Sequence, residues 1–291
     1  MGRVTIKELL DHKLRLALTA IAIVLGVTFI TGSYVLTDTL NSTIDSVFST
    51  VYQHVDFQVR GVAQFPSSAG GAVRNPIPES VLTAVRKVPG VKLADGSVTG
   101  YAQFVARDGK PIPSSATTIG DSYNPDQQIS ILRVVQGKPP TTSHDVVMDA
   151  GTAKKYGFKV GDAVRILFQG KSGVFTITGI SKFAGNDSLA GATFATFTMP
   201  TAQALFNEVG RVDDINVVAD PGANRSDVER GIARVLPSGV EVVTGQTVVS
   251  EQTSAINQAL SFFSTALLVF AFISIFVGAF TILNTFSIIV G

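Results

Sequence analysis

The stretch that decides the fold is Leu16–Leu36, which reads LALTAIAIVLGVTFITGSYVL. It contains no charged residue, and its threonine and serine hydroxyls can hydrogen-bond back to their own helix. A helix rises about 1.5 Å per residue, so this stretch would span roughly 30 Å, the thickness of the hydrocarbon core of a bilayer. We therefore predict a first transmembrane helix at residues 16–36.

A second uncharged stretch runs from Phe262 to Gly291 and is also long enough to cross a bilayer. The whole chain of 291 residues is only 15% charged, whereas soluble domains carry about 25%. The shortage of charge lies in the two apolar stretches, and residues 37–261 between them have the composition of a soluble domain. We predict two transmembrane helices, 16–36 and 262–291, bracketing one extramembrane domain at 37–261.

The charges that flank the apolar stretches predict the orientation of the chain. Arg3, Lys7, Lys13 and Arg15 precede the first stretch, whereas Thr37–Thr50 contains no lysine or arginine. Basic residues are enriched on the cytoplasmic side of membrane helices. The N-terminus is therefore expected in the cytoplasm and the large domain outside it, in a multi-pass protein of the cell (plasma) membrane.

A cleaved signal peptide is the alternative for the first apolar stretch. The apolar region of a signal peptide usually has about 7–15 residues and ends at a small-x-small cleavage site. Here the apolar stretch is longer, and Thr31–Ser33 (TGS) lies inside it. The sequence favours a retained span.

Three polar or amphipathic segments flank the predicted spans. In residues 1–15, Ile6, Leu9 and Leu10 recur at helical spacing, which predicts a helix on the cytoplasmic membrane surface. The alternative is that these residues are the first turns of the membrane helix itself. Apolar residues also recur at helical spacing in Thr37–Gln53 and Gln246–Ser261, which we predict to be helical stalks that join the spans to the outer domain.

The outer domain is predicted to be mixed α+β, with two subdomains. Its apolar alternation predicts many short strands, and it lacks the regular strand–helix alternation of a parallel α/β fold. We expect strands at 55–60, 98–106, 129–135, 146–149, 163–168, 174–183, 193–199, 215–219 and 240–243, and a loop at 61–75. We expect helices from Pro78 to Val88, at 151–156 and at 200–206. We expect a further helix whose buried face is formed by Val228, Ile232 and Val235.

The sequence offers no catalytic, cofactor-binding or metal-binding residues. His12, His54 and His144 are scattered without ligand spacing, and the chain contains no cysteine. There is no phosphate-binding G-x-x-x-x-G-K-[ST] loop, so ATP hydrolysis of that type is excluded. Asp213–Asp214 is interpreted as a solvated sheet edge, and a net charge of +1 gives no broad basic face for nucleic acid. We expect no enzyme activity of the chain's own.

Several segments together resemble a known family. These are RVTIKELLDHKLR before the first span, VVMDAGTAKKYGFKVGDAVRIL and GVFTITGIS in the outer domain, and INVVADPGANRSDVERGIARVLPSGVEVVT before the second stalk. Their order and spacing are similar to those of the MacB/FtsX-type ABC transporter permeases, which carry a MacB-like periplasmic core domain. The resemblance covers essentially the whole chain.

The resemblance implies a permease subunit that works with a separate cytoplasmic ABC ATPase, contacts membrane lipid and forms a homo- or heterodimer of permease units. Such a subunit would couple ATP hydrolysis to movement of its outer domain, for export, lipoprotein or lipid extraction, or mechanotransmission. Family members usually have four or more spans, so the chain is expected to be truncated after its second span, before the coupling segment.

Other functions fit the same layout of span, outer domain and span. One is a transmembrane sensor with an extracytoplasmic ligand domain. Others are a regulator of a cell-wall enzyme and a membrane-anchored structural or adhesion protein. The layout alone does not separate them, and nothing in the sequence identifies a transported substrate.

Overall fold

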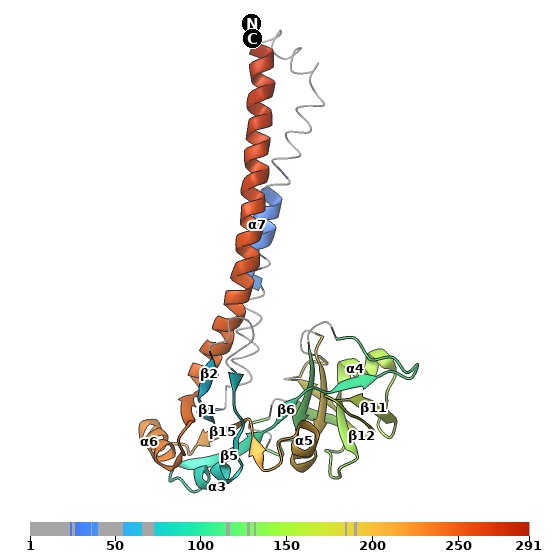
Figure 1. Cartoon of the computed structure of the whole chain (residues 1–291), viewed down its shortest axis with the longest axis vertical. Helices are drawn as coiled ribbons and strands as arrows, with labels where there is room; N and C mark the ends of the chain where they lie inside the picture. The colour runs from blue at the N-terminus through green and yellow to red at the C-terminus, as the bar shows by residue number, and fades with distance from the viewer. Residues whose placement is uncertain are drawn as a thin grey trace. The chain divides into compact units, whose positions relative to one another are not determined.

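The computed structural model describes residues 24, 27–35, 37–39, 55–65, 73–114, 117–126, 129–130, 132–183, 185–188 and 191–290 (Figure 1). The chain divides into two compact units. The first contains residues 1–46, 68–70 and 252–291, and the second contains residues 47–67 and 71–251.

Helix dominates the described part of the first unit. Residues 27–35 and 37–39 are helical, and α7 (Gly245–Val290) provides the rest from Gln252 onward. Among the residues that the structure describes, no helix is both long and apolar enough to cross a membrane. The predicted surface helix at 1–15, the start of the first span and residues 40–53 of the predicted first stalk lie outside the described residues.

A four-stranded antiparallel sheet forms one part of the second unit. Its strand order is β16 (Val240–Thr244), β1 (Phe57–Gly61), β15 (Asp214–Ala219) and β5 (Val91–Ser97). Side chains alternate between the two faces, so Phe57 and Val59 lie on one face and Gln58 and Arg60 on the other. Helices α3 (Ser80–Val85) and α6 (Arg225–Val235) contact this sheet and each other.

An eight-stranded mixed sheet forms the other part. Its order is β6 (Thr99–Gly100), β8 (Thr118–Ser122), β13 (Thr193–Phe197), β10 (Asp145–Asp149), β12 (Ser172–Phe183), β11 (Ala163–Leu167) and β7 (Gln103–Val105), and β9 (Leu132–Gly137) pairs with β12. The pairs β10–β12 and β8–β13 are parallel. Helices α4 (Ala150–Tyr156) and α5 (Met199–Phe206) follow β10 and β13 directly.

Both helices of this part have side-chain caps. The carboxylate of Asp149 accepts a hydrogen bond from the amide of Thr152 at the start of α4, and Thr198 caps α5 in the same way through Thr201. Gly157 and Asn207 end α4 and α5 in the left-handed conformation, which satisfies their last carbonyls. Local sequence therefore sets where each helix begins and ends.

Two small ribbons complete the second unit. Strands β2 (Ala63–Phe65) and β3 (Val73–Arg74) pair with each other, as do β4 (Ile77–Pro78) and β14 (Arg211–Val212). The prediction of a loop at 61–75 is therefore wrong at both ends of this range, where β2 and β3 form strands. The alternation there is too short, and too rich in glycine and serine, to separate a ribbon from a loop.

One hydrophobic cluster contains residues from both sheets. It includes Phe57 and Ile215 of the four-stranded sheet and Phe104, Ile177 and Phe197 of the eight-stranded sheet, all at most 1% exposed. Aromatic rings meet within it, with the Phe175 and Phe197 centroids 5.1 Å apart. Burial of these side chains is the main stabilising term for the domain.

The predicted mixed α/β outer domain is confirmed. The β11–β12 hairpin lies at the predicted position, as do the strand at 240–243 and the helices near 151, 200 and 228. Val235 is 42% exposed, because it is the last residue of α6 and lies beyond the packed face. Strands β5 and β8 were not predicted, since VKLADGS and TIGDS lack a clear apolar alternation.

Candidate functional site

Helix α7 starts directly from the four-stranded sheet. Strand β16 ends at Thr244 and α7 begins at the next residue. The Thr244 hydroxyl accepts a hydrogen bond from the Thr247 amide at 3.1 Å, and the Gly245 amide donates to the Asp56 carbonyl at 2.9 Å. The Val248 side chain, 1% exposed, anchors the first turn by burial. No loop separates the sheet from the helix.

Four charged side chains surround this start of α7, and we call them the α7 anchor: Arg60, Arg74, Glu241 and Glu251. Arg60 of β1 lies 3.1 Å from Glu241 of β16 and 2.7 Å from Glu251 of α7. Arg74 of β3 lies 2.6 Å and 3.4 Å from the same two carboxylates. Each arginine therefore pairs with each glutamate, and three strands and one helix are joined.

The two arginines of the α7 anchor differ in burial. The Arg60 side chain is 6% exposed, whereas the side chains of Glu241 and Glu251 are 34% and 47% exposed. A buried guanidinium needs its carboxylate partners, because an unpaired buried charge is costly. Arg74 also donates to the Gly61 carbonyl at 2.9 Å. The start of α7, up to Glu251, is thus tied to the sheet through Arg60.

A polar row extends from the α7 anchor across the sheet. Glu241, Arg60, Asp214 and Ser97 are directly opposite one another on β16, β1, β15 and β5. Residues opposite each other in antiparallel strands share a face. Burial raises the pKa of Asp214, and the hydrogen bond donated by the Ser97 hydroxyl at 2.9 Å and the charge of Arg60 partly offset this rise. The row connects the start of α7 to the region where β5 leads into β6.

Further carboxyl groups gather at that end of the row. Asp213 accepts hydrogen bonds from the amide and the hydroxyl of Thr99, at 2.6 Å and 2.9 Å. Burial, with the nearby charge of Asp214, raises the pKa of Asp121 to about 7. Burial also raises the pKa of Asp214 to about 7, and burial together with Asp213 raises that of Glu208 to about 7.

The sequence-based interpretation of Asp213–Asp214 as a solvated edge is wrong. Strand β15 lies between β1 and β5, so Asp214 is inside the sheet and paired with Ser97. His144 is exposed, and His12 and His54 lie outside the described residues. No group of three or more metal-ligating side chains was found in the described part of the chain. Sequence reasoning did not find the α7 anchor, because its residues lie up to 191 positions apart in the chain.

A family model decides the relationship of this chain to known proteins. The model of the MacB-like periplasmic core domain matches residues 16–235. The chain belongs to this family. The resemblance predicted from the quoted segments is thereby confirmed. The matched residues include the eight-stranded sheet, the carboxyl cluster and three strands of the four-stranded sheet, while β16 and the start of α7 lie just beyond them.

One curated protein and two solved structures are similar to parts of this chain. A curated protein of Mycobacterium tuberculosis, described as an uncharacterized ABC transporter permease protein, is 29% identical over 201 residues. The match covers 68% of this chain but only 21% of that relative. The periplasmic region of MacB from Actinobacillus actinomycetemcomitans gives a TM-score of 0.47 at 13% identity, covering 67% of this chain and 92% of that one. The extracellular domain of the transporter YknZ from Gram-positive bacteria gives 0.45 at 13%, covering 64% and 98%.

Proposed function

We propose that this chain is a membrane subunit of an ABC transporter permease, with its MacB-like core domain outside the cytoplasm. Membership of the MacB-like family supports this function, as does the description of the Mycobacterium tuberculosis relative. The carboxyl cluster and the α7 anchor contain no arrangement of nucleophile and base, so they give no support to an enzymatic role. We propose a mechanical role for the domain.

The proposed topology follows from charge and hydropathy. Residues 16–36 and 262–291 cross the membrane, residues 1–15 lie on its cytoplasmic surface, and residues 37–261 form the outer domain with its stalks. The basic residues that precede Leu16 keep the N-terminus in the cytoplasm. The protein is then a multi-pass protein of the cell membrane whose spans contact lipid.

The proposed partner is a separate cytoplasmic ABC ATPase. The printed residues contain no phosphate-binding loop of the G-x-x-x-x-G-K-[ST] type, and the family resemblance implies that a separate subunit hydrolyses ATP. Two permease units, identical or different, would assemble with it as a dimer. ATP binding and hydrolysis would then change the tilt of the spans.

One observation carries the mechanical part of the proposal. Helix α7 begins at the residue after β16, and Glu251 in its second turn pairs with the buried Arg60. A continuous helix is stiff, and no flexible loop lies at its junction with the sheet to absorb a tilt. A change in the direction of α7 would therefore be passed to β1 and β16, and through them to the core domain.

Co-purification tests the proposed partnership. The tagged protein, expressed in its own host at native level, should retain a soluble ABC ATPase after extraction in mild detergent. The ATPase activity of that complex should change when the outer domain is held by an antibody fragment. Recovery of a kinase or methyl-accepting protein instead would support a sensor. Recovery of a cell-wall hydrolase together with the ATPase would support a regulatory rather than a transporting role.

A further inference from the structure

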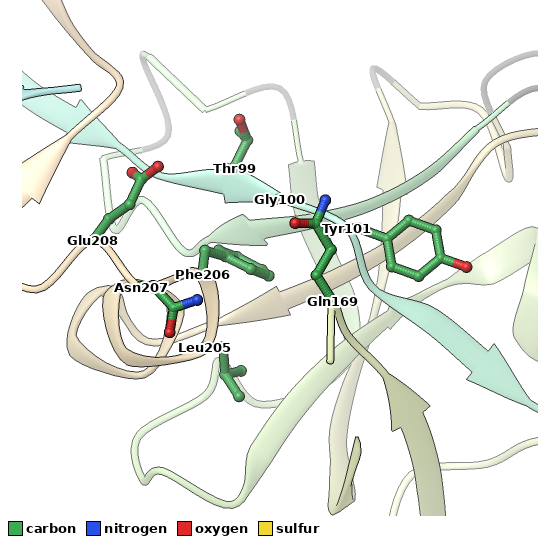
Figure 2. A pocket seen from close by; sticks show the side chains of 8 residues that line it. All are labelled: Thr99, Gly100, Tyr101, Gln169, Leu205, Phe206, Asn207 and Glu208. Carbon is green, nitrogen blue, oxygen red and sulfur yellow. The ribbon is translucent and has the colours of Figure 1, made fainter. Parts of the chain in front are cut away.

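A small pocket lies beside the carboxyl cluster, between β6, the turn that joins β11 to β12, and the C-terminal end of α5 (Figure 2). Figure 2 shows Thr99 and Glu208 at one end of this pocket and Gln169 and Tyr101 at the other. Its volume is about 170 Å³, whereas binding pockets for small molecules usually have about 300–1,000 Å³. The outer edge of the four-stranded sheet offers a partner a longer surface.

Strand β16 forms this outer edge. Its residues Val240–Thr244 are half-buried, and within the described part of the chain they pair with β1 alone. Native proteins usually protect such an edge with proline, lysine, a β-bulge or a charge that points inward. Residues 240–244 contain no proline or lysine, and their register with β1 is unbroken. Their one charged side chain, that of Glu241, pairs with the arginines of the α7 anchor. The edge therefore lacks the usual features that prevent pairing with a further strand.

Two hydrogen bonds show which residues of β16 bond to β1. The Val62 amide donates to the Gly239 carbonyl, and the Gly245 amide donates to the Asp56 carbonyl, both at 2.9 Å. In an antiparallel pair, residues that exchange hydrogen bonds alternate with residues that do not. The odd-numbered residues of β16 therefore bond to β1, and the even-numbered residues direct their backbone groups to the outer edge.

The even-numbered residues are Val240, Val242 and Thr244. The Val240 amide is already used, because it donates to the Pro237 carbonyl at 3.2 Å. Thr244 directly precedes α7, and the carbonyl of a residue in this position accepts the first hydrogen bond of the helix. The remaining groups are the Val240 carbonyl, the amide and carbonyl of Val242, and the Thr244 amide. Among the residues that the structure describes, none bonds to these four groups.

We propose that β16 pairs with β16 of a second copy of this chain, antiparallel and centred on Val242. A two-fold axis at this residue places Val242 opposite Val242 of the second copy, and Val240 opposite Thr244 of the second copy. Each Val242 amide then donates to the other Val242 carbonyl, and each Thr244 amide donates to the other Val240 carbonyl. Every remaining outward group is used in this register, whereas a register shifted along the strand leaves some of them unpaired.

The side chains of β16 also suit this register. On the polar face of the sheet, Glu241 lies opposite Val243 of the second copy, so no two like charges are directly opposite each other. On the other face, Val242 meets Val242 of the second copy, and pairs of β-branched side chains pack well across strands. The two four-stranded sheets thus become one continuous sheet without a charge conflict at the junction.

The symmetry of the pair agrees with a shared membrane. The two-fold axis of two antiparallel strands is perpendicular to their sheet, so the polar faces of both copies lie on the same side. Glu251 pairs with Arg60 on the polar face, and α7 therefore starts from the same side of the combined sheet in both copies. This inference rests on the proposed function, in which two permease units lie in one membrane, and it names the surface through which identical units would meet.

Cross-linking of the full chain at residue 243 tests the pairing. The chain contains no cysteine, so Val243→Cys supplies a single thiol on the polar face. With strands about 4.8 Å apart and a rise of about 3.4 Å per residue, the two thiol-bearing residues lie about 8 Å apart in the proposed register. An ethylene-bridged bismaleimide spans this separation. In mild detergent we expect rapid cross-linking of two copies, and cross-linking at least tenfold slower for Lys138→Cys, which lies exposed after β9.

A pair of substitutions at Val242 tests the hydrogen bonds in the Val243→Cys background. Val242→Pro removes the outward amide, whereas Val242→Ala keeps this amide and is the matched control for loss of the side chain. Proline is tolerated in an edge strand where the amide points away from the sheet. We expect cross-linking about tenfold slower in Val242→Pro than in Val242→Ala, because each copy loses one hydrogen bond. Circular dichroism checks folding, and the comparison with Lys138→Cys gives the answer if Val242→Pro does not fold.

The outcomes separate this pairing from the proposed function. Equal cross-linking of Val243→Cys and Lys138→Cys would overturn the pairing, as would equal rates in folded Val242→Pro and Val242→Ala. Cross-linking of Val243→Cys in native membranes to a different protein, identified by mass spectrometry, would contradict a second copy as the partner. If the ABC ATPase co-purifies but the copies do not cross-link, only the pairing is wrong. If the copies cross-link but no ATPase co-purifies, the pairing stands and the permease function is wrong.

Discussion

The guanidinium group of Arg60 lies 2.7 Å from the carboxylate of Glu251, although 191 positions separate the two residues in the chain. Arg60 belongs to a central strand of the four-stranded sheet, and Glu251 belongs to α7. Their pairing, with Glu241 and Arg74, joins the last helix of the chain to the MacB-like core domain. The proposed transmission of movement from α7 to the core domain depends on the α7 anchor.

Glu251→Gln should loosen the start of α7 without unfolding the domain. Glu251 is half-exposed, so loss of its charge should lower the free energy of unfolding by no more than about 1 kcal/mol. Hydrogen exchange at the amides of residues 247–251 should become faster, because the first turns of α7 lose their tie to Arg60. Glu229→Gln on α6 is the control, and equal exchange in both variants would show that the pair does not hold the helix.

Arg60→Met should be more damaging than Arg74→Met. The Arg60 side chain is almost fully buried and pairs with two carboxylates, whereas that of Arg74 is 18% exposed. We expect Arg60→Met to cost about 2 kcal/mol in urea unfolding, because it removes charged hydrogen bonds to both glutamates, and Arg74→Met less than half of that. A larger loss for Arg74→Met would reverse the roles given to the two arginines.

The carboxyl cluster should make the domain more stable in mild acid. Burial raises the pKa of Asp121, Asp214 and Glu208 to about 7 in the folded protein, above the values of about 4 in an unfolded chain. Their protonated forms are therefore favoured by folding. This stability is fully present below about pH 4 and is lost as the pH rises through 7.

Asp121→Asn tests this pH dependence. The variant carries no charge to desolvate, so its melting temperature at pH 8 should rise by about 2–4 °C and depend less on pH. Asp108→Asn, at an exposed turn, is the control and should follow the unmodified protein. A steeper pH dependence in Asp121→Asn would contradict the assignment of a raised pKa to this group.

Sequence reasoning predicted the class of this fold better than its site. The alternation in Ala163–Leu167 and Ser172–Phe183 is regular, so the hairpin could be placed from local pattern alone. Strand β5 contains lysine, aspartate and glycine, and pairing with β15 rather than its own composition makes it a strand. The α7 anchor depends on side chains brought together by β1, β3, β16 and α7, and no local pattern marks such a set.

Gly137→Ala should destabilise the eight-stranded sheet strongly. Gly137 has φ of 74°, and a Cβ atom there would collide with the carbonyl oxygen of Thr178 in β12. Gly109 has a similar φ of 82° but open space around it, so Gly109→Ala measures the backbone strain alone. We expect Gly109→Ala to cost about 1 kcal/mol and Gly137→Ala at least 2 kcal/mol more. Equal losses would mean that β9 shifts freely on β12.

The most direct test of the mechanical proposal measures movement of the outer domain in the assembled complex. The chain contains no cysteine, so Gly2→Cys and Lys110→Cys provide two unique sites for spin labels. In the complex with its ATPase, the distance distribution between them should differ between ATP and ADP. A Gly-Pro insertion after Gln252 should abolish this difference while ATP turnover continues. If the insertion left the difference intact, α7 would not transmit the movement, and the central claim would be wrong.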